Sequence, residues 1–290
     1  MQYRWLFLIF SLAAVTATPF VLSHFRNSIA DPAFFNSTRV TILSWKPRVF
    51  LYKNFLSEEE CDHLIKLAKS KLEESTVIDP DSGNNVKSEV RTSSGMFLDK
   101  RQDHIVASIE RRISGWTFLP QENGENIQFL QYEATQKYEP HFDYFYDEKD
   151  QLRGGHRYAT VIMYLSDVKE GGETVFPKAE GWKSQPKDET FSDCAKKGLA
   201  VKPVKGDAVL FYNLKPDAVP DPLSLHASCP VIQGKKWVAT KWIRLGSFDS
   251  IPSPPSAVET AADIYPESIT EDENSETVAS VDESVEEQEL

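Results

Sequence analysis

Cysteine and histidine are both scarce in this 290-residue chain, which contains three cysteines and six histidines. Cys61, Cys194 and Cys229 allow at most one internal disulfide, and the sequence does not decide which two would pair. Their spacing matches no zinc knuckle, so a cysteine-ligated zinc module is not expected.

Lysine and arginine are absent from residues 251–290, which contain twelve of the chain's 44 acidic residues. The net charge of −12 therefore belongs to this segment, because the remaining acids and bases balance. A segment of this composition cannot bury enough apolar surface to offset its ordering entropy, so we expect residues 249–290 to form a disordered acidic tail. The chain also lacks a basic stripe, and no nucleic-acid partner is expected.

Only one long hydrophobic run occurs, over residues 5–22, and it carries no charged residue. A helix needs about 20 residues to span a membrane. We expect residues 1–24 to form a short cytoplasmic stub and a signal-anchor transmembrane helix, followed by a lumenal stem over residues 25–46. The alternative is a signal peptide that is cleaved off.

Either alternative places the rest of the chain in the secretory lumen, because no second span brings it back. We expect a single-pass type II protein of the endoplasmic reticulum or Golgi membrane, with its folded domain in the lumen. Asn36 begins the only Asn-X-Ser/Thr sequon, Asn36-Ser37-Thr38, and is the predicted glycosylation site.

The middle of the chain, residues 47–248, is long enough for one domain with a sizeable core. Ser57-Glu58-Glu59-Glu60 predicts the capping box of a helix, and apolar residues from Ile105 to Ile113 predict a second helix. Beyond Gly124, β-branched and aromatic runs separated by glycine turns predict strands. Helices followed by antiparallel strands indicate an α+β fold, a jelly-roll barrel flanked by N-terminal helices. The predicted strands cover residues 127–133, 158–166, 208–213 and 236–245.

The stretch KYEPHFDYF places His141 and Asp143 one residue apart in a strand-like context. Side chains at i and i+2 of a strand share a face, so the two can share a metal ion if a third ligand joins them. His226 is the expected third ligand. His156 is the alternative, although its glycine-rich loop positions a ligand poorly. Two histidines and one carboxylate with three open positions are typical of non-haem Fe(II) oxygenases.

Lys236 lies ten residues after His226, across a turn at Gly234. In such oxygenases a 2-oxo acid occupies two of the open metal positions. A second carboxylate on that acid needs a cation at the far end of the pocket, which the Lys236 ammonium can supply. The alternative is that Lys236 is one more surface lysine beside Lys235.

Three stretches of the chain resemble the catalytic domain of prolyl 4-hydroxylases, especially the membrane-anchored plant type: QYEATQKYEPHFDYF, RYATVIMYLSDVKEGGETVFP and HASCPVIQGKKWVATKW. The resemblance extends to NFLSEEECDHLI and SEVRTSSGMFL and covers nearly all of residues 47–247. It implies a double-stranded β-helix that uses Fe(II), 2-oxoglutarate and O₂, with ascorbate keeping the iron reduced. It also implies 4-hydroxylation of peptidyl proline, with succinate and CO₂ as the co-products.

The resemblance also assigns roles to individual residues. Tyr132 matches a family tyrosine that binds the cosubstrate carboxylate together with Lys236, and Thr174 and Trp242 match positions of the same pocket. The implied substrate-binding residues are Arg91, Tyr144, Phe145 and Arg157, with residues 76–93 as a loop that closes over the peptide. His156 departs from the family pattern, which often has a polar amide there.

The plant type implies hydroxyproline-rich glycoproteins, such as extensins and arabinogalactan proteins, as substrates. It also implies that no disulfide-isomerase subunit is required, while the oligomeric state stays open. Three alternatives remain: a zinc hydrolase with the same three ligands, a catalytically silent membrane-tethered binding module, and a hydroxylase of another side chain such as lysine.

Overall fold

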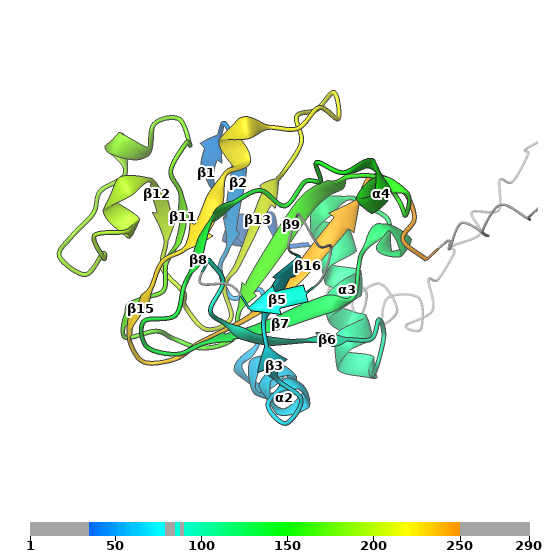
Figure 1. Ribbon diagram of the computed structural model, residues 1–290, viewed down its shortest axis with the longest axis horizontal. Coiled ribbons are helices and arrows are strands. Elements are labelled where there is room, and N and C mark those ends of the chain that lie inside the picture. Colours follow the sequence, from blue (N-terminus) through cyan, green and yellow to red (C-terminus); the bar gives the residue numbers. More distant parts are fainter. Residues whose placement is uncertain (1–34, 79–84, 88–89, 250–290) are drawn as a thin grey trace, which may run out of the picture. The chain divides into compact units, whose positions relative to one another are not determined.

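The computed structural model describes residues 35–78, 85–87 and 90–249 (Figure 1). The predicted anchor over residues 5–22 and the predicted tail from residue 250 onward lie outside these ranges, as do residues 79–84 of the predicted peptide loop. Within the described part of the chain, no helix is long and apolar enough to cross a membrane.

Antiparallel sheets dominate the described residues. The large sheet has eight strands in the order β1-β2-β13-β9-β16-β7-β6-β3, and a smaller one has four in the order β12-β11-β14-β8. Two strand pairs, β10 with β15 and β4 with β5, complete the set. The large-sheet strands are β1 (Val40–Trp45), β2 (Arg48–Tyr52), β3 (Glu73–Glu74), β6 (Ser94–Leu98), β7 (Ile127–Tyr132), β9 (Arg157–Tyr164), β13 (Ala208–Tyr212) and β16 (Lys236–Arg244). The others are β4 (Thr76–Ile78), β5 (Asn85–Lys87), β8 (Tyr138–His141), β10 (Glu170–Gly171), β11 (Thr174–Phe176), β12 (Leu199–Val201), β14 (His226–Ser228) and β15 (Val231–Gln233).

Two long helices begin at clear caps. Helix α2 (Glu58–Ala68) has the predicted capping box: the Ser57 hydroxyl accepts from the Glu60 backbone N–H at 3.2 Å, and the Glu60 carboxylate accepts from the Ser57 N–H at 2.9 Å. Asp103 caps α3 (His104–Thr117) by accepting from the Val106 N–H at 2.8 Å. The shorter elements are α4 (Glu148–Gln151) and the 3₁₀ turns η1 (Ser37–Arg39), η2 (Gln121–Asn123), η3 (Trp182–Ser184), η4 (Ala195–Lys197) and η5 (Pro222–Ser224).

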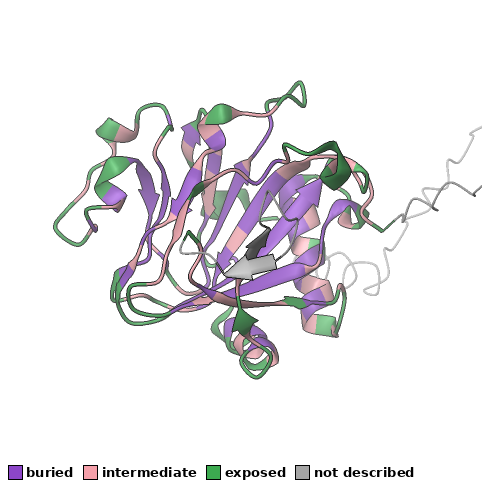
Figure 2. Ribbon diagram, in the orientation of Figure 1, coloured by how far each residue is buried: buried purple, intermediate pink, exposed green. Residues whose placement is uncertain are grey.

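The two helices pack on one face of the large sheet, and a cavity lies at its other face. Val161 of β9 and Phe129 of β7 are fully buried in one core cluster with Ile109 of α3. Their neighbours Thr160 and Leu130 point the other way and line the cavity. This alternation follows from the two-residue period of a strand. Because both faces are covered, the central strands are coloured as buried in Figure 2.

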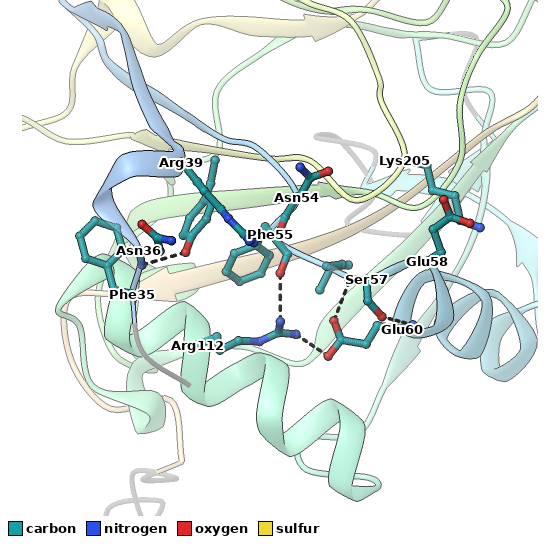
Figure 3. Close-up of a pocket in the computed structure, with 12 residues that line it drawn as sticks. Phe35, Asn36, Arg39, Asn54, Phe55, Ser57, Glu58, Glu60, Arg112 and Lys205 are labelled. Atoms are coloured by element: carbon teal, nitrogen blue, oxygen red, sulfur yellow. Dashed lines mark hydrogen bonds and ion pairs between the residues drawn. The ribbon is translucent and has the colours of Figure 1, made fainter. Parts of the chain in front are cut away.

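A surface cavity on another side of the domain lies where η1, β2 and α2 meet (Figure 3). There the Arg112 guanidinium of α3 donates to the Phe55 carbonyl at 3.0 Å and to the Glu60 carboxylate at 2.7 Å. These bonds tie α3 to the chain that leads into α2.

The four predicted strands and both predicted helices are confirmed, but the order of elements is not. The expectation of helices first and strands afterwards is wrong, because the β1–β2 hairpin precedes α2. Residues 40–45, which the sequence assigned to the stem, form β1. The pattern was missed because β1 is an edge strand whose Ile42 and Trp45 are exposed.

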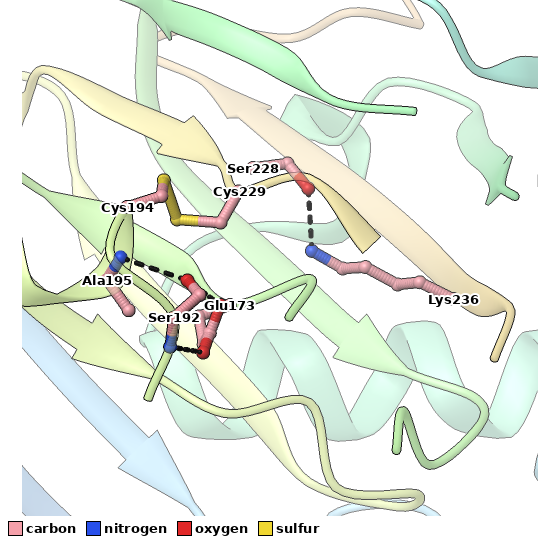
Figure 4. Close-up of a disulfide and its surroundings, with 7 residues drawn as sticks. All are labelled: Glu173, Ser192, Cys194, Ala195, Ser228, Cys229 and Lys236. Atoms are coloured by element: carbon pink, nitrogen blue, oxygen red, sulfur yellow. Dashed lines mark hydrogen bonds between the residues drawn. A yellow bond between two sulfur atoms is a disulfide. The ribbon is translucent and has the colours of Figure 1, made fainter. Parts of the chain in front are cut away.

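The disulfide that the sequence left open joins Cys194 to Cys229 (Figure 4). Cys61 is a buried free thiol. Burial raises the pKa of Cys61 to about 11, so this thiol stays protonated and inert at neutral pH. The disulfide links the η4 segment to the residue that follows β14.

Candidate metal centre

His141, Asp143 and His226 converge on one point, with one ligand atom from each lying within 4.8 Å of the others. His141 ends β8, and His226 begins β14 directly opposite it in the antiparallel pair. The sequence placed Asp143 on the same strand as His141, but β8 ends at His141. The two side chains nevertheless meet, with 3.7 Å between His141 Nε2 and Asp143 Oδ1.

Backbone carbonyls fix both imidazole rings. His141 Nδ1 donates to the Glu139 carbonyl at 2.8 Å, and His226 Nδ1 donates to the Ser224 carbonyl at 3.1 Å. With the proton on Nδ1, each ring presents the lone pair of Nε2 to the site. This is the orientation by which neighbouring groups prepare a histidine for a metal ion.

The protonation states also suit a cation. Burial, followed by the neighbouring His226, holds the pKa of His141 well below its usual range, so the ring is neutral. Burial alone would raise the pKa of Asp143, but His226 and His141 outweigh it and the net shift is downward. A neutral imidazole at His141 and an ionised carboxylate at Asp143 are the forms that bind a metal ion.

His156, the alternative third ligand, is not among the residues that converge. Its Nδ1 accepts a long hydrogen bond from the Phe145 backbone N–H, at 3.4 Å. In the part of the chain that the structure describes, the three converging residues are the only such group.

The three candidate metal ligands line a cavity between the large and the small sheet. The large sheet lines it with alternate residues of β7, β9 and β16, and the small sheet with residues of β8, β11 and β14. Representative lining residues are Tyr132, Thr160 and Lys236 on one side and His141, Thr174 and His226 on the other.

Lys236 is not a surface lysine, because only 2% of it is exposed. Its Nζ donates to Ser228 Oγ at 2.9 Å, as Figure 4 shows, and lies 5.4 Å from the ring centre of its cross-strand partner Tyr132. Burial lowers the pKa of Lys236 to about 7, against the opposing effect of Glu173. Among the described residues no carboxylate forms an ion pair with it, so this buried cation suits an anionic ligand.

Thr174 and Trp242 also line the cavity, as the resemblance implied. The Thr174 hydroxyl accepts from the Tyr164 hydroxyl at 2.8 Å. The indole Nε1 of Trp242 is buried without a hydrogen-bond partner. A buried donor of this kind suits an acceptor atom of a bound ligand.

Of the four predicted substrate-binding residues, Arg157 and Arg91 contact side chains that line the cavity, and Phe145 lies beside Arg157. Arg157 donates twice to the Glu125 carboxylate, at 2.8 and 2.9 Å, and lies 3.7 Å above the Trp242 ring and 5.0 Å from the Phe145 ring. Arg91 lies 5.1 Å from the ring of Tyr138. Tyr138 in turn stacks on His141 at 3.6 Å.

Tyr144, like Arg91, Phe145 and Arg157, is not itself among the cavity-lining residues. Its ring packs between Phe142 at 4.7 Å and Tyr146 at 5.4 Å. Sequence reasoning missed Tyr138 and Ser228, which touch His141 and Lys236. No pattern marks such common residue types, and only the strand register places them.

Two imidazoles, one carboxylate and a buried lysine that lines the same cavity define a site for a divalent metal and an anionic cosubstrate. This is the ligand set of the non-haem Fe(II) oxygenases. Residues 127–244 match the 2OG-Fe(II) oxygenase superfamily.

Individual relatives narrow this class. The chain is 64% identical over 215 residues to "Probable prolyl 4-hydroxylase 7" of Arabidopsis thaliana, which covers 74% of this chain and 68% of that protein. It is 57% identical over 228 residues to "Prolyl 4-hydroxylase 2" of the same plant, and the match covers 77% of this chain and 76% of that protein. A solved viral collagen prolyl hydroxylase from Paramecium Bursaria Chlorella virus-1, in complex with 2OG, is 27% identical with a TM-score of 0.49, over 68% of this chain and 95% of that one.

On the identity to the plant proteins, the chain belongs to the prolyl 4-hydroxylase family. It is an oxygenase that depends on Fe(II), 2-oxoglutarate and O₂. Membership removes the zinc hydrolase and the silent binding module from the alternatives.

Proposed function

We propose that this enzyme hydroxylates C4 of peptidyl proline in proline-rich secretory proteins of the extensin and arabinogalactan type. The reaction is coupled to oxidative decarboxylation of 2-oxoglutarate to succinate and CO₂. The observation that carries the proposal is the convergence of His141, Asp143 and His226 in a cavity that the buried Lys236 also lines.

His141 and His226 bind the iron through Nε2, and Asp143 binds it through a carboxylate oxygen. When bound, Fe(II) supplies the O₂ chemistry that oxidises both 2-oxoglutarate and the proline. A ligand set of two histidines and one carboxylate would leave the remaining metal positions for the cosubstrate and O₂. Ascorbate keeps the iron reduced.

Lys236 binds the distal carboxylate of 2-oxoglutarate, and Ser228 holds its ammonium in place. Tyr132, the cross-strand partner of Lys236, adds a second donor: burial raises the pKa of its hydroxyl to about 12, so it keeps its proton. Thr174 and Trp242 complete the pocket. Their positions in the cavity lining support these roles.

The peptide approaches past Tyr138, Arg91, Phe145 and the Arg157–Glu125 pair. A polyproline II chain loses little conformational entropy on docking, and it favours grooves lined with aromatic rings. The stacking of Tyr138 on His141 supports this path, because it places an aromatic face beside the metal residues.

We assign the domain over residues 47–248, with β1 added, to the double-stranded β-helix class. Two antiparallel sheets with the cavity between them support the assignment. The domain lies in the lumen of the endoplasmic reticulum or Golgi, tethered by the N-terminal anchor, and works without a disulfide-isomerase subunit. Asn36 carries a glycan, which its exposed position at the surface cavity of Figure 3 would accommodate.

Peptide competition tests the substrate class. Repeated-proline peptides and collagen-like Gly-X-Pro peptides of equal length are incubated together with the full chain, and 4-hydroxyproline is located by mass spectrometry. We expect the repeated-proline peptides to be preferred, with KM falling as the peptide lengthens. Equal use of isolated prolines in a glycine-rich peptide would refute the polyproline groove, and hydroxylysine as the product would refute prolyl specificity.

A further inference from the structure

The Asp143 carboxylate accepts a hydrogen bond from a residue of the large sheet. The hydroxyl of Thr160, on β9 of the large sheet, donates to Asp143 Oδ2 at 2.7 Å. Thr160 is fully buried, so water does not compete for this bond. The hydrogen bond therefore connects a candidate metal ligand to the rigid centre of the eight-stranded sheet.

The Thr160 hydroxyl is itself oriented by Asn213, which follows β13. Asn213 Nδ2 donates to Thr160 Oγ1 at 2.9 Å. A hydroxyl has one proton and two acceptor lone pairs. Since the amide of Asn213 occupies a lone pair, the single proton of Thr160 is directed to Asp143.

The backbone holds Asn213 firmly. Its N–H donates to the Tyr158 carbonyl at 2.9 Å, and its carbonyl accepts from the Asp221 N–H at 2.9 Å. The residue is fully buried, and its side-chain Oδ1 has no hydrogen-bond partner. A buried amide oxygen without a hydrogen-bond partner lowers the stability of the fold. The hydrogen bond from the Asn213 amide to Thr160 is the interaction that offsets this cost.

The three metal residues differ in how they are held. His141 and His226 are opposed in a strand pair, and each ring is fixed by the backbone carbonyl two residues earlier. Asp143 lies beyond the end of β8, where this strand pairing does not reach. Its orientation needs another source.

We propose that Asn213 and Thr160 are positioning residues that form a relay, Asn213 to Thr160 to Asp143, and fix the Asp143 carboxylate for the metal. The inference rests on the proposed role of Asp143 as a ligand. Partners of this kind typically change metal affinity by about 10- to 100-fold when removed. These hydrogen bonds lead to Asp143 and not to Lys236, so replacing Thr160 or Asn213 should change the affinity for 2-oxoglutarate little.

The test measures Fe(II) affinity directly, by anaerobic calorimetry on the full chain without cosubstrate or peptide. Thr160→Val removes the hydroxyl at nearly constant shape and should weaken Fe(II) binding by about 10- to 100-fold. Thr160→Ser keeps the hydroxyl and should retain most of the affinity. Thr117→Val is the matched control: Thr117 is also buried, but its hydroxyl donates to the Ile113 carbonyl within α3. It should bind Fe(II) as the wild type does.

Asn213→Ala should weaken Fe(II) binding by about threefold to tenfold, the effect of one lost hydrogen bond. If Asn213 acts through Thr160, the double variant should be no weaker than Thr160→Val alone. Additive losses would overturn the relay. Should Thr160→Val fail to fold, Asn213→Ala and Thr160→Ser carry the test by themselves.

Asp143→Ala separates this inference from the function on which it rests. If that variant keeps wild-type Fe(II) affinity, Asp143 is not a ligand and the proposed function fails. If Asp143→Ala loses iron while Thr160→Val and Asn213→Ala bind it normally, the relay alone is wrong.

Discussion

The buried amine of Lys236 is the residue-level feature on which the proposed binding of the cosubstrate rests. An ammonium with 2% exposure has lost nearly all of its hydration, and among the described residues its one hydrogen bond goes to the neutral Ser228. A dicarboxylate that enters the cavity restores a charged partner. On this proposal, the binding of 2-oxoglutarate also neutralises the buried charge of Lys236.

Removing the ammonium should weaken 2-oxoglutarate binding selectively. A charge-assisted hydrogen bond contributes about 1.5–3 kcal/mol, so Lys236→Ala should raise the KM for 2-oxoglutarate by about 10- to 150-fold. Fe(II) affinity should stay near that of the wild type. Steady-state kinetics with 2-oxoglutarate as the varied substrate measures the effect, and an unchanged KM would mean that the distal carboxylate is bound elsewhere.

The lowered pKa of Lys236 also predicts a pH dependence. With a pKa of about 7, Lys236 is charged below that pH in the free enzyme and loses its proton above it. Above pH 7, binding of the dianion must therefore take up a proton, and affinity should fall by up to about tenfold per pH unit.

Calorimetry with 2-oxoglutarate between pH 6 and 9 tests this dependence. Lys236→Arg is the matched variant, because arginine stays charged throughout and should bind with a flat profile. The same slope in both proteins would assign the titration to another group.

At this scale the sequence predicted the groups that carry the chemistry and missed those that orient them. His141, Asp143 and Lys236 stand out because their residue types and spacing are rare in combination. Thr160 and Asn213 do not, because they are common residues brought together by the pairing of β9 with β13. That pairing cannot be read from either segment alone.

Among the elements, β14 links three parts of the site. It contains His226 and Ser228, and the next residue, Cys229, is joined by the disulfide to Cys194. Nearby, the buried Glu173 carboxylate accepts from the Ser192 N–H and hydroxyl at 2.9 and 2.8 Å, as Figure 4 shows. The disulfide and these hydrogen bonds therefore stabilise the end of β14 that contains Ser228.

Breaking the disulfide should weaken the positioning of Ser228 beside Lys236. The Cys194→Ser/Cys229→Ser variant should lose about 2–4 kcal/mol of unfolding free energy, as expected for a closed loop of this size. Its KM for 2-oxoglutarate should rise as Ser228 shifts away from Lys236.

Thermal melting and kinetics measure the two effects, with Cys61→Ala as the control. Cys61 is buried in the core cluster between the helices and the large sheet, and it is distant in sequence from Cys194 and Cys229. Its replacement should therefore lower stability without changing the KM for 2-oxoglutarate. If the disulfide variant melts early but keeps its KM, the bond stabilises the fold and does not position Ser228.

The elements with strong local signals were predictable, and the hairpin at the start of the fold was not. β7, β9, β13 and β16 are rich in β-branched and aromatic residues and lie at or near the centre of the large sheet. β1 and β2 combine exposed and buried residues without a clean alternation, and a register shift interrupts their pairing. β2 joins the sheet by pairing with β13, which lies 156 or more residues later in the chain, and β1 in turn pairs with β2.

At the scale of the whole molecule, the proposed N-terminal anchor predicts where the enzyme is located. The anchor hypothesis predicts that the full chain stays in the membrane pellet after carbonate extraction and keeps its N-terminus. It also predicts a glycan that Asn36→Gln abolishes, seen as a mobility shift after glycosidase treatment. Release into the supernatant without residues 1 to about 20 would make the protein secreted, and no shift would place Asn36 outside the glycosylation pathway.

The most direct test of the central claim compares His226→Ala with His156→Gln. If His141, Asp143 and His226 hold the iron, His226→Ala should lose both Fe(II) binding and 4-hydroxyproline formation while the protein remains folded. His156→Gln should keep most of both. Loss of iron in His156→Gln together with retention in His226→Ala would contradict the account.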